Sequence, residues 1–395
     1  MRIFKETNFD FLGKRWLAIG LSLVLMAAAV FSLVVKGGPR YGIDFNGGAL
    51  MYVKFANQPP ADKIRSALSA KISGEITVQD LAGSDEVLIG TEIKSEQELN
   101  AARSKMEEVL RANFGQPGDK LDLNNVGHDA LMNRLRDPLQ RAGAALSEQQ
   151  LSELVKAILD YRDSAPRSGL LRSVDELAAV PGVTPAVMAA LKQECYASGF
   201  AIRNVEMVGP KVGADLRRQA VMATLYALGG MLVYIAFRFE WIYGVGAVLA
   251  VFHDTLITIG LFSIFNKEIS LTVVAALLTL VGYSMNDTIV IFDRIRENLK
   301  VLRKTKLETL MNISVNQTLS RTVLTSGLTF LTCAALFLFG GPVLHGFSFA
   351  LVVGIIIGTY SSVFIASPIV LFWNNFLESR KRAAIAAPAG KTRKG

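Results

Sequence analysis

The sequence predicts a polytopic α-helical membrane protein that carries one extracytoplasmic α+β head. Of its 395 residues, 51% are hydrophobic and only 19% are charged, whereas about a quarter of the residues of a soluble domain are charged. Several apolar runs approach the roughly 20 residues that cross a bilayer. Between them lies a hydrophilic block, 37–219, which is long enough to fold as a domain of its own.

Six apolar stretches are the predicted transmembrane helices. Four of them reach the length of a crossing without help: 16–35, 270–292, 322–340 and 346–373. The other two, 220–237 and 242–264, cross with a contribution from their flanks. The first run is longer than the roughly 7–15 residues of a secretory signal core, so we expect a retained anchor.

Basic residues predict the orientation of the chain in the cell inner membrane. Those on the predicted cytoplasmic side precede the first span or follow the second, fourth and sixth: Arg2, Lys5, Lys14, Arg15, Arg238, Arg294, Arg296, Lys300, Arg303, Lys304, Lys306, Arg380, Lys381, Arg382, Lys391, Arg393 and Lys394. A smaller set of basic residues lies on the predicted extracytoplasmic side: Lys36, Arg217, Arg218 and Lys267. Both termini are therefore predicted to be cytoplasmic, and topology accounts for the net charge of +8 without a nucleic-acid partner.

The predicted spans divide the chain into seven segments. They are a cytoplasmic tail (1–15), the first span (16–36), the extracytoplasmic head (37–219), spans two to four (220–292), a cytoplasmic loop (293–320), spans five and six (321–376) and a basic cytoplasmic tail (377–395). The last span contains a small-residue pattern, Gly354 to Gly358, which favours close helix packing.

The head is predicted to contain four strands and two helices in the order β-α-β-β-α-β. Hydrophobic alternation predicts strands at 48–55, 75–81, 86–92 and 200–208, and helical periodicity predicts helices at 60–72 and 95–113. Ser95, with Glu98 three residues later, forms a capping-box pattern at the start of the second helix. This order is that of the ferredoxin-like arrangement.

A helical insert, about 115–198, separates the second helix from the last strand. The run that starts at Leu146 is amphipathic, and 173–191 predicts two short helices around Gly182. The latter part resembles a helix-hairpin-helix unit, which can hold DNA phosphate through backbone amides. Because the insert is predicted to lie outside the cytoplasm and lacks a dense Lys/Arg surface, we expect a protein-interaction module and no nucleic-acid contact.

Polar side chains within the spans are the candidate functional residues, since a charged group in hydrocarbon costs on the order of 2.5–3.5 kcal/mol. The fourth span carries Asn286 and Asp287 within its apolar part, and Arg321 opens the fifth. Antiparallel neighbouring spans bring Asp287 and Arg321 to a similar depth. The third span carries His253 and Asp254 near its middle.

A buried acid beside an arginine can carry a proton. Burial favours the neutral acid and the guanidinium favours the carboxylate, so a small rearrangement changes which form prevails. We therefore expect Asp287, with Arg321 and Asn286, on a proton pathway. The alternative is a buried ion pair that fixes helix packing. For His253 and Asp254, a proton pathway and a hydrogen-bonded helix contact are equally open.

Enzymatic and cofactor chemistry are not expected. The chain contains no GxxxxGK[ST] phosphate loop and no Ser/His/Asp or Cys/His nucleophile set. Its histidines, His128, His253 and His345, are scattered, so no metal site is expected. Cys195 falls in the head and Cys333 in the fifth span, so a disulfide is not expected either.

The chain resembles the SecF family of the bacterial protein-export machinery. The matching stretches, in the family's order, are 42–48 (GIDFNGG), 252–254 (FHD), 281–298 (VGYSMNDTIVIFDRIREN), 316–322 (NQTLSRT) and 339–342 (FGGP). The sister subunit SecD shares the architecture but differs at these motifs. The resemblance implies half of a bundle like that of RND-superfamily transporters, with SecD as the other half. The insert 115–198 departs from the family's compact head.

The resemblance implies a role in protein export. The family is understood to use proton flow to drive its external domain against a preprotein that emerges from the SecYEG channel, after the SecA ATPase has acted. Asp287 and Arg321 match the residues of the family's proton path. YajC and YidC are further partners that the resemblance implies. In this interpretation the chain is a non-enzymatic subunit without a cofactor.

Three other functions remain open. A small-molecule efflux transporter of the RND type would share the architecture, although the modest head has no obvious large apolar pocket. A passive scaffold for SecD and the channel would let Asp287 pack without titrating. A DNA-handling membrane protein would act through the insert.

Overall fold

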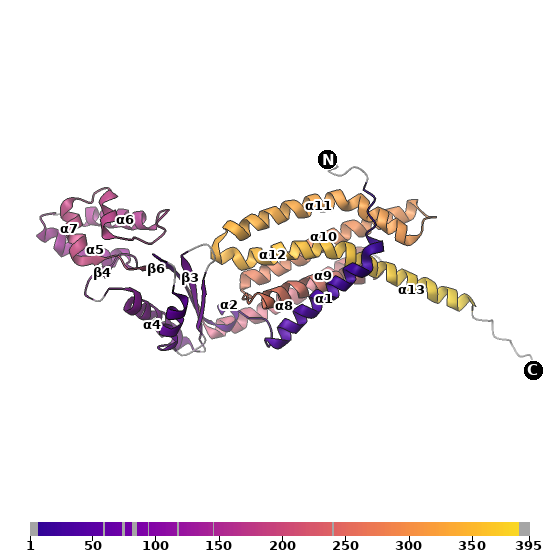
Figure 1. Cartoon of the computed structure of the whole chain (residues 1–395), viewed down its shortest axis with the longest axis horizontal. Coiled ribbons are helices and arrows are strands. Elements are labelled where there is room, and N and C mark those ends of the chain that lie inside the picture. The colour runs from indigo at the N-terminus through magenta and orange to yellow at the C-terminus, as the bar shows by residue number, and fades with distance from the viewer. Residues whose placement is uncertain are drawn as a thin grey trace, which may run out of the picture. The chain divides into compact units, whose positions relative to one another are not determined.

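The computed structural model describes residues 7–57, 60–72, 76–80, 85–93, 95–116, 118–144, 146–238 and 241–386. The chain forms two compact units, shown in Figure 1. The helical unit comprises residues 1–42 and 216–395, and the α+β unit comprises residues 43–215. Basic residues of both predicted tails, such as Arg2, Lys5 and Lys391, lie outside the described residues.

Long helices build the helical unit. In chain order they are η1 (Leu12–Lys14), α1 (Arg15–Val35), α8 (Pro210–Arg238, which begins in the other unit), α9 (Trp241–Ile264), α10 (Leu271–Val301), α11 (Leu307–Phe339), α12 (Gly341–Ser361), the π-helical turn η3 (Ser362–Ala366) and α13 (Ser367–Ala386). Helix α12 packs against both α10 and α11, and α1 packs along α9. The turn η3 joins α12 to α13 without a break in the helical backbone.

Five helical segments among the described residues are long and apolar enough to cross a membrane. They are Leu12–Val35, Trp241–Ile264, Leu271–Val301, Leu307–Phe339 and Val343–Arg380. The chain is therefore a multi-pass membrane protein. Helix α8, which contains the predicted second span, is not among the five. Its N-terminal part, which begins in the other unit, carries Lys211, Arg217 and Arg218.

Helices α10 and α11 continue beyond the apolar stretches that predicted them. The segment 293–320, expected as a loop, is helical except for residues 302–306. Asn298 Nδ2 donates to Ser314 Oγ at 2.8 Å and to Gln317 Oε1 at 2.9 Å, which ties the two extensions together. Hydropathy predicts where the apolar part of a helix ends. The helix itself can continue beyond that point where packing against a neighbour stabilises it.

The small-residue pattern of the sixth predicted span packs against α10. A Cβ added at Gly354 would lie 2.5 Å from the methyl carbons of Leu280, and one added at Gly358 would lie 3.1 Å from Cβ of Ser284. The absence of side chains at these glycines lets the two helices approach closely, as small residues do at membrane helix contacts.

The α+β unit contains a four-stranded antiparallel sheet in the order β2-β3-β1-β6. Its elements are α2 (Ile43–Asn46), β1 (Gly48–Phe55), α3 (Ala61–Ser69), β2 (Ile76–Asp80), β3 (Glu86–Glu92), α4 (Glu96–Phe114) and β6 (Phe200–Val208). These positions confirm the predicted strands and helices to within a few residues. Ile64 and Leu68 of α3, and Met106 and Leu110 of α4, pack into one core with alternate strand residues such as Met51, so both helices cover one face.

The insert has a hydrophobic core of its own. Its elements are β4 (Leu121–Asp122), α5 (His128–Arg141), α6 (Glu148–Asp163), the 3-10 helix η2 (Val174–Ala179), α7 (Pro185–Glu194) and β5 (Cys195–Tyr196). Leu131, Val155, Leu177 and Leu191 bring the four helices together in this core. The two predicted short helices are η2 and α7. Gly182 between them has a φ of +90°, a conformation that favours glycine.

A buried polar network holds the two ends of the insert together. Asn124 Nδ2 donates to the carbonyl oxygens of Leu171 and Ser198, at 2.9 Å each, and Asn124 Oδ1 accepts from the Leu171 N–H at 2.8 Å. Asn125 Oδ1 accepts from the N–H of Ile202 on β6 at 2.8 Å. Beside them β4 and β5 pair in parallel. The entry and the exit of the insert are therefore anchored together at the sheet.

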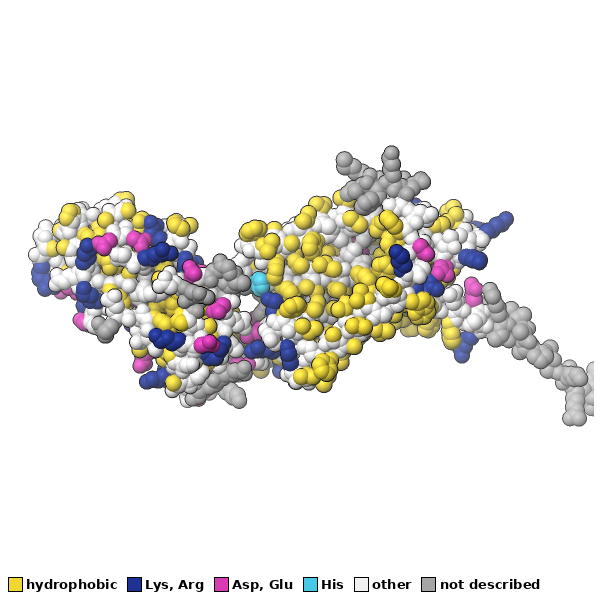
Figure 2. All heavy atoms as spheres, in the orientation of Figure 1, with side chains coloured by type: hydrophobic (Ala, Val, Ile, Leu, Met, Phe, Trp, Pro, Cys, Tyr) yellow, Lys and Arg dark blue, Asp and Glu magenta, His cyan; other side chains and the backbone are white. Residues whose placement is uncertain are grey.

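The two units carry different surfaces. Figure 2 shows hydrophobic side chains spread over the visible face of the helical unit, as expected for a surface that meets lipid or another membrane subunit. Over the α+β unit, charged side chains of both signs are interspersed with polar ones. This mixture is typical of a domain in water.

We expect Gly260→Ala to destabilise the contact between α1 and α9. The new Cβ would lie 2.1 Å from Cβ and 2.7 Å from Cα of Ala29, and a backbone atom cannot turn aside. Overpacking of this kind costs about 1–3 kcal/mol, so the thermal unfolding temperature of the purified protein should fall. Gly20→Ala is the matched control, because a Cβ at Gly20 meets nothing within 4 Å. Equal unfolding temperatures for the two variants would contradict the contact.

Cys195 provides a test of the network around Asn124. Its thiol is 2% exposed, and burial raises its pKa to about 12, so near neutral pH it remains protonated and unreactive. Asn124→Ala leaves buried backbone groups unpaired, at about 1–3 kcal/mol. In a Cys333→Ser background, maleimide labelling of Cys195 should then accelerate by roughly 5- to 150-fold.

The control for this labelling experiment is Gln149→Ala. Gln149 donates to Glu153 on the exposed side of α6, at 3.2 Å, and takes no part in the network. If the Asn124→Ala chain labels as slowly as this control, the network does not hold the insert closed.

Candidate functional site

Asp287 lies in the interior of the helical unit. It stands on α10, is 2% exposed, and its Oδ2 accepts a hydrogen bond of 2.9 Å from Ser326 Oγ of α11. In the part of the chain that the structure describes, no lysine or arginine forms an ion pair with it. A carboxyl group so placed is costly to ionise and is supported by a single hydroxyl donor.

Arg321 and Asn286, the other two predicted members of the site, are exposed on the isolated chain. The expected ion pair between Asp287 and Arg321 is not formed among the described residues. Sequence spacing placed both residues at a similar depth but did not decide which face of each helix they occupy. Asn286 lies on the exposed side of α10, whereas Asp287 lies on its buried side.

His253 and Asp254 form a second buried polar cluster. His253 Nδ1 lies 2.9 Å from Asp254 Oδ1, and Asp254 Oδ2 accepts from Ser284 Oγ of α10 at 2.5 Å and from Ser361 Oγ of α12 at 2.7 Å. The two residues are 4% and 1% exposed, respectively. The cluster joins three helices, α9, α10 and α12.

Three serines are functional candidates that sequence reasoning missed. Ser284, Ser326 and Ser361 are not among the site residues that the sequence predicts. The structure shows all three donating to buried carboxyl groups. A serine or threonine within an apolar run does not by itself indicate a functional site. Its hydroxyl group can donate a hydrogen bond to a backbone carbonyl of the same helix, as Thr288 does to Ser284.

The exposed faces of α10 and α11 each carry a stripe of small and polar residues. The stripes follow a spacing of three and four: Ala275, Thr279, Gly282 and Asn286 on α10, and Arg321, Thr325 and Thr332 on α11, where the apolar Leu328 stands between the two threonines. Small and polar residues are enriched where membrane helices pack against one another. An arginine facing lipid would be costly, so this surface suits a protein partner better than lipid.

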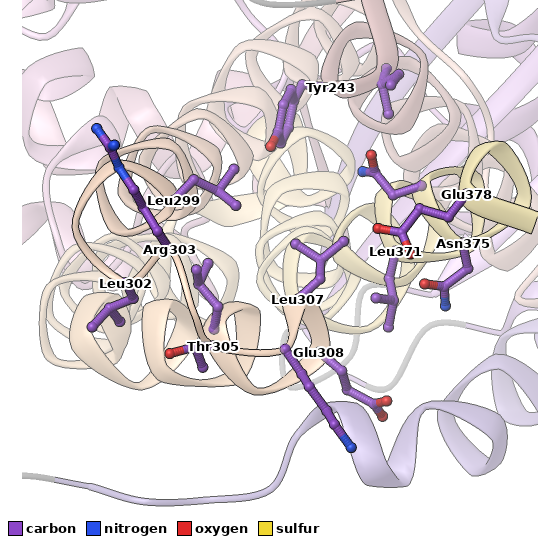
Figure 3. A pocket seen from close by; sticks show the side chains of 14 residues that line it. Tyr243, Leu299, Leu302, Arg303, Thr305, Leu307, Glu308, Leu371, Asn375 and Glu378 are labelled. Atoms are coloured by element: carbon purple, nitrogen blue, oxygen red, sulfur yellow. The ribbon is translucent and has the colours of Figure 1, made fainter. Parts of the chain in front are cut away.

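A cavity of about 610 Å³ lies at the end of the bundle that carries the α10–α11 connection. Figure 3 shows Arg303, Thr305 and Glu308 from that connection and the start of α11, with Asn375 and Glu378 of α13 across from them and Tyr243 of α9 above. None of the five predicted site residues lines this cavity. Asp287, His253 and Asp254 lie in the packed interior of the helical unit, outside this pocket, whereas Asn286 and Arg321 are exposed.

The described residues hold no group of three or more His, Cys, Asp or Glu that could bind a metal ion. Cys195 and Cys333 are both buried and free. His128 is half-buried on the insert, where its hydrogen bond with Asp129 raises its pKa. These groups do not converge with Asp287 or Asp254.

Comparison with known proteins finds similarity to subunits of the protein-export machinery over nearly the whole chain. A family model described as "Protein export membrane protein SecD/SecF, C-terminal" matches residues 187–376, which include all five predicted site residues. A protein translocase subunit SecF of Koribacter versatilis is 50% identical and aligns over 98% of this chain and 97% of its own length. The subunit of the same name from Vibrio alginolyticus is 36% identical over 90% of this chain and 88% of its own length.

Solved structures agree with this result. The structure of SecDF from Thermus thermophilus, described as a translocon-associated membrane protein, matches with a TM-score of 0.64 and 32% identity over 94% of this chain. A SecDF structure in a super-membrane-facing form matches with a TM-score of 0.56 and 31% identity over 96% of the chain. This chain spans 39% and 41% of the lengths of those two chains.

Proposed function

Because this chain belongs to the SecF family of protein translocase subunits, we propose that it works with a SecD partner and uses proton flow to drive late steps of protein export. The observation that carries the proposal is Asp287, a 2% exposed carboxyl group within α10 that has one hydroxyl donor. An ionisable residue inside a membrane span is costly and is retained where it serves transport. Proton loading and release at Asp287 would change the charge inside the bundle by one unit.

A change in the charge of Asp287 could couple proton binding to a conformational step. With the proton bound, the carboxyl group is neutral and compatible with its buried position. With the proton released, the carboxylate would attract the guanidinium of Arg321, which stands on the neighbouring helix α11 and forms no ion pair with it among the described residues. A membrane potential contributes about 2.3 kcal/mol per charge per 100 mV, which is enough to bias such a step. Asn286 is proposed to line the same path from the exposed side of α10.

We assign the polar stripes on α10 and α11 to the contact with SecD. Both stripes face outward from this chain, and the SecDF chain of known structure is more than twice as long as the part that this chain matches. In this arrangement the chain is one half of an RND-type bundle, and α8 is its sixth span. Apolar side chains exposed along α8, such as Leu225, Val233 and Phe237, favour a place in the membrane.

The proposed orientation follows the short-loop charges. Both termini and the α10–α11 connection lie in the cytoplasm, and the α+β unit lies outside the inner membrane. The sheet order β2-β3-β1-β6, with both helices on one face, supports a ferredoxin-like head with the helical insert added before its last strand. Further proposed partners are the SecYEG channel, exported preproteins, SecA acting indirectly, and the accessory proteins YajC and YidC.

We expect Asp287→Asn to abolish the proton-dependent part of export. The amide keeps the shape and can still accept from Ser326, but it cannot release a proton. In inverted vesicles that contain SecD, completion of a preprotein should lose its response to a proton gradient while the complex still assembles. Thr288→Val, next to Asp287 and equally buried, is the matched control, because its hydroxyl bonds to its own helix.

The result of this experiment also separates the alternatives. Retained gradient dependence in an assembled Asp287→Asn complex would favour the passive scaffold, in which Asp287 only packs. A small-molecule efflux transporter would instead show gradient-dependent export of added dyes that the variant loses, with preprotein completion unchanged.

Gly282→Leu provides a test of the assigned SecD surface. A Cβ at Gly282 meets nothing within 4 Å in this chain, so the subunit should fold, but a leucine there adds bulk at the proposed contact. We expect co-purification of SecD to fall by about tenfold, since overpacking costs about 1–3 kcal/mol. Gly229→Leu on α8, where nothing lies within 4 Å either, is the control. Equal recovery of SecD with both variants would reject the assignment.

A further inference from the structure

The carboxyl group of Asp254 is surrounded by hydrogen-bond donors. Ser284 and Ser361 donate to Oδ2, and the His253 ring faces Oδ1. A carboxylate only accepts hydrogen bonds, so these contacts suit the ionised form. Asp254 is nevertheless 1% exposed, and no lysine or arginine in the described ranges is bonded to it. With a neutral His253, the pair would be a buried, uncompensated negative charge, which costs several kcal/mol.

Protonation of His253 removes that charge but creates another unsatisfied group. His253 Nε2 is buried and has no hydrogen-bond partner among the described residues. An imidazolium donates from both nitrogens, so the proton on Nε2 would lack an acceptor, at about 1–3 kcal/mol. Each protonation state of the pair thus leaves one group unsatisfied. The carboxylate without a counter-charge favours loading of a proton on His253, and the Nε2–H without an acceptor favours its release.

Helix α9, which carries the pair, packs against α1, where Ser32 bonds to Ser263 and Ala29 meets Gly260. Ser22, earlier on α1, is also buried. Ser22 Oγ donates to the hydroxyl of Tyr360 on α12 at 3.2 Å.

The pair is connected to Asp287 through α10. Ser284, which donates to Asp254, precedes Asp287 by three residues and therefore lies on the same helical face. On the other side, Ser361 is followed directly by the π-helical turn Ser362–Ala366. Turns of this kind occur often at functional sites in helices. A change in the charge of Asp254 would act on both helices through these two serines.

We propose that His253 and Asp254 form a second proton-binding site in the membrane interior, which loads and releases a proton in addition to the one carried by Asp287. This inference rests on the proposed function, since it adds a site to the same proton-driven cycle. Loading forms one N–H bond at His253 and release breaks it, and the proton comes from water and returns to water. Asp254 holds the imidazolium as its counter-ion, and Ser284 and Ser361 report its charge to α10 and α12.

The test is His253→Asn in vesicles that contain SecD. The asparagine amide places an N–H where the Nδ1 donor was, so it keeps the bond to Asp254 but cannot titrate. We expect the complex to assemble, gradient-driven completion of a preprotein to fall by about tenfold or more, and the remaining rate to lose its dependence on pH. Thr258→Val, buried on the same helix with its hydroxyl bonded to the Asp254 carbonyl, should behave as the unmodified protein.

The failure of this inference is distinguishable from the failure of the proposed function. If Asp287→Asn abolishes gradient dependence while His253→Asn keeps the unmodified rate and pH profile, the pair is a packing contact and the second site is rejected. If Asp287→Asn retains gradient dependence, the proposed function itself fails.

A second measurement does not depend on assembly of the variant. The chain has three histidines, His128, His253 and His345, so ¹⁵N-histidine can be incorporated into this subunit alone and assigned with His128→Gln and His345→Gln. Solid-state NMR of the complex in proteoliposomes should show the His253 ring changing protonation over the pH range in which export responds. A His253 ring that stays in one state throughout would overturn the proposal.

Discussion

A polar group inside an apolar bundle must find a partner, and this constraint organises the helical unit. Hydroxyl side chains can meet it at low cost, because they bond to their own helix when no other partner is near, as Thr258 and Thr288 do. Ser284, Ser326 and Ser361 instead donate across helix contacts to the carboxyl groups of Asp254 and Asp287. These contacts hold neighbouring helices together and give each acid at least one hydroxyl donor.

Helix α10 connects the features that bear on function. Its buried face carries Ser284 and Asp287, and its exposed face carries Gly282 and Asn286. The same helix therefore contributes an acid to the interior of this chain and a polar, small-residue surface to its exterior. A change of charge on the buried face would be felt along the helix whose other face we assign to SecD. In the proposed cycle, this arrangement would link proton binding to movement between the two halves of the bundle, and the cavity near Arg303 lies outside it.

In the α+β unit, side-chain amides provide partners for buried polar groups, as hydroxyl groups do in the helical unit. Asn124 and Asn125 pair with backbone groups at both ends of the insert and with β6, so a segment of more than seventy residues is held at one buried point. The insert keeps a hydrophobic core separate from that of the sheet. Force applied to either part would pass through this network, which is the physical reason to expect the sheet and the insert to act together.

The sequence by itself determined the class of the protein and the strands and helices of the head. These follow from local periodicity and hydropathy, because a strand or helix buries one face and a span must be apolar. It also predicted Asp287, Arg321, His253 and Asp254 as candidates, because ionisable groups are rare in spans. Only the tertiary structure decided that Arg321 and Asn286 face outward, that Asp287 pairs with Ser326, and that Ser284 and Ser361 converge on Asp254. Those facts depend on how helices rotate and pack against one another, and no local pattern encodes a contact between residues such as Asp254 and Ser361, which lie 107 positions apart.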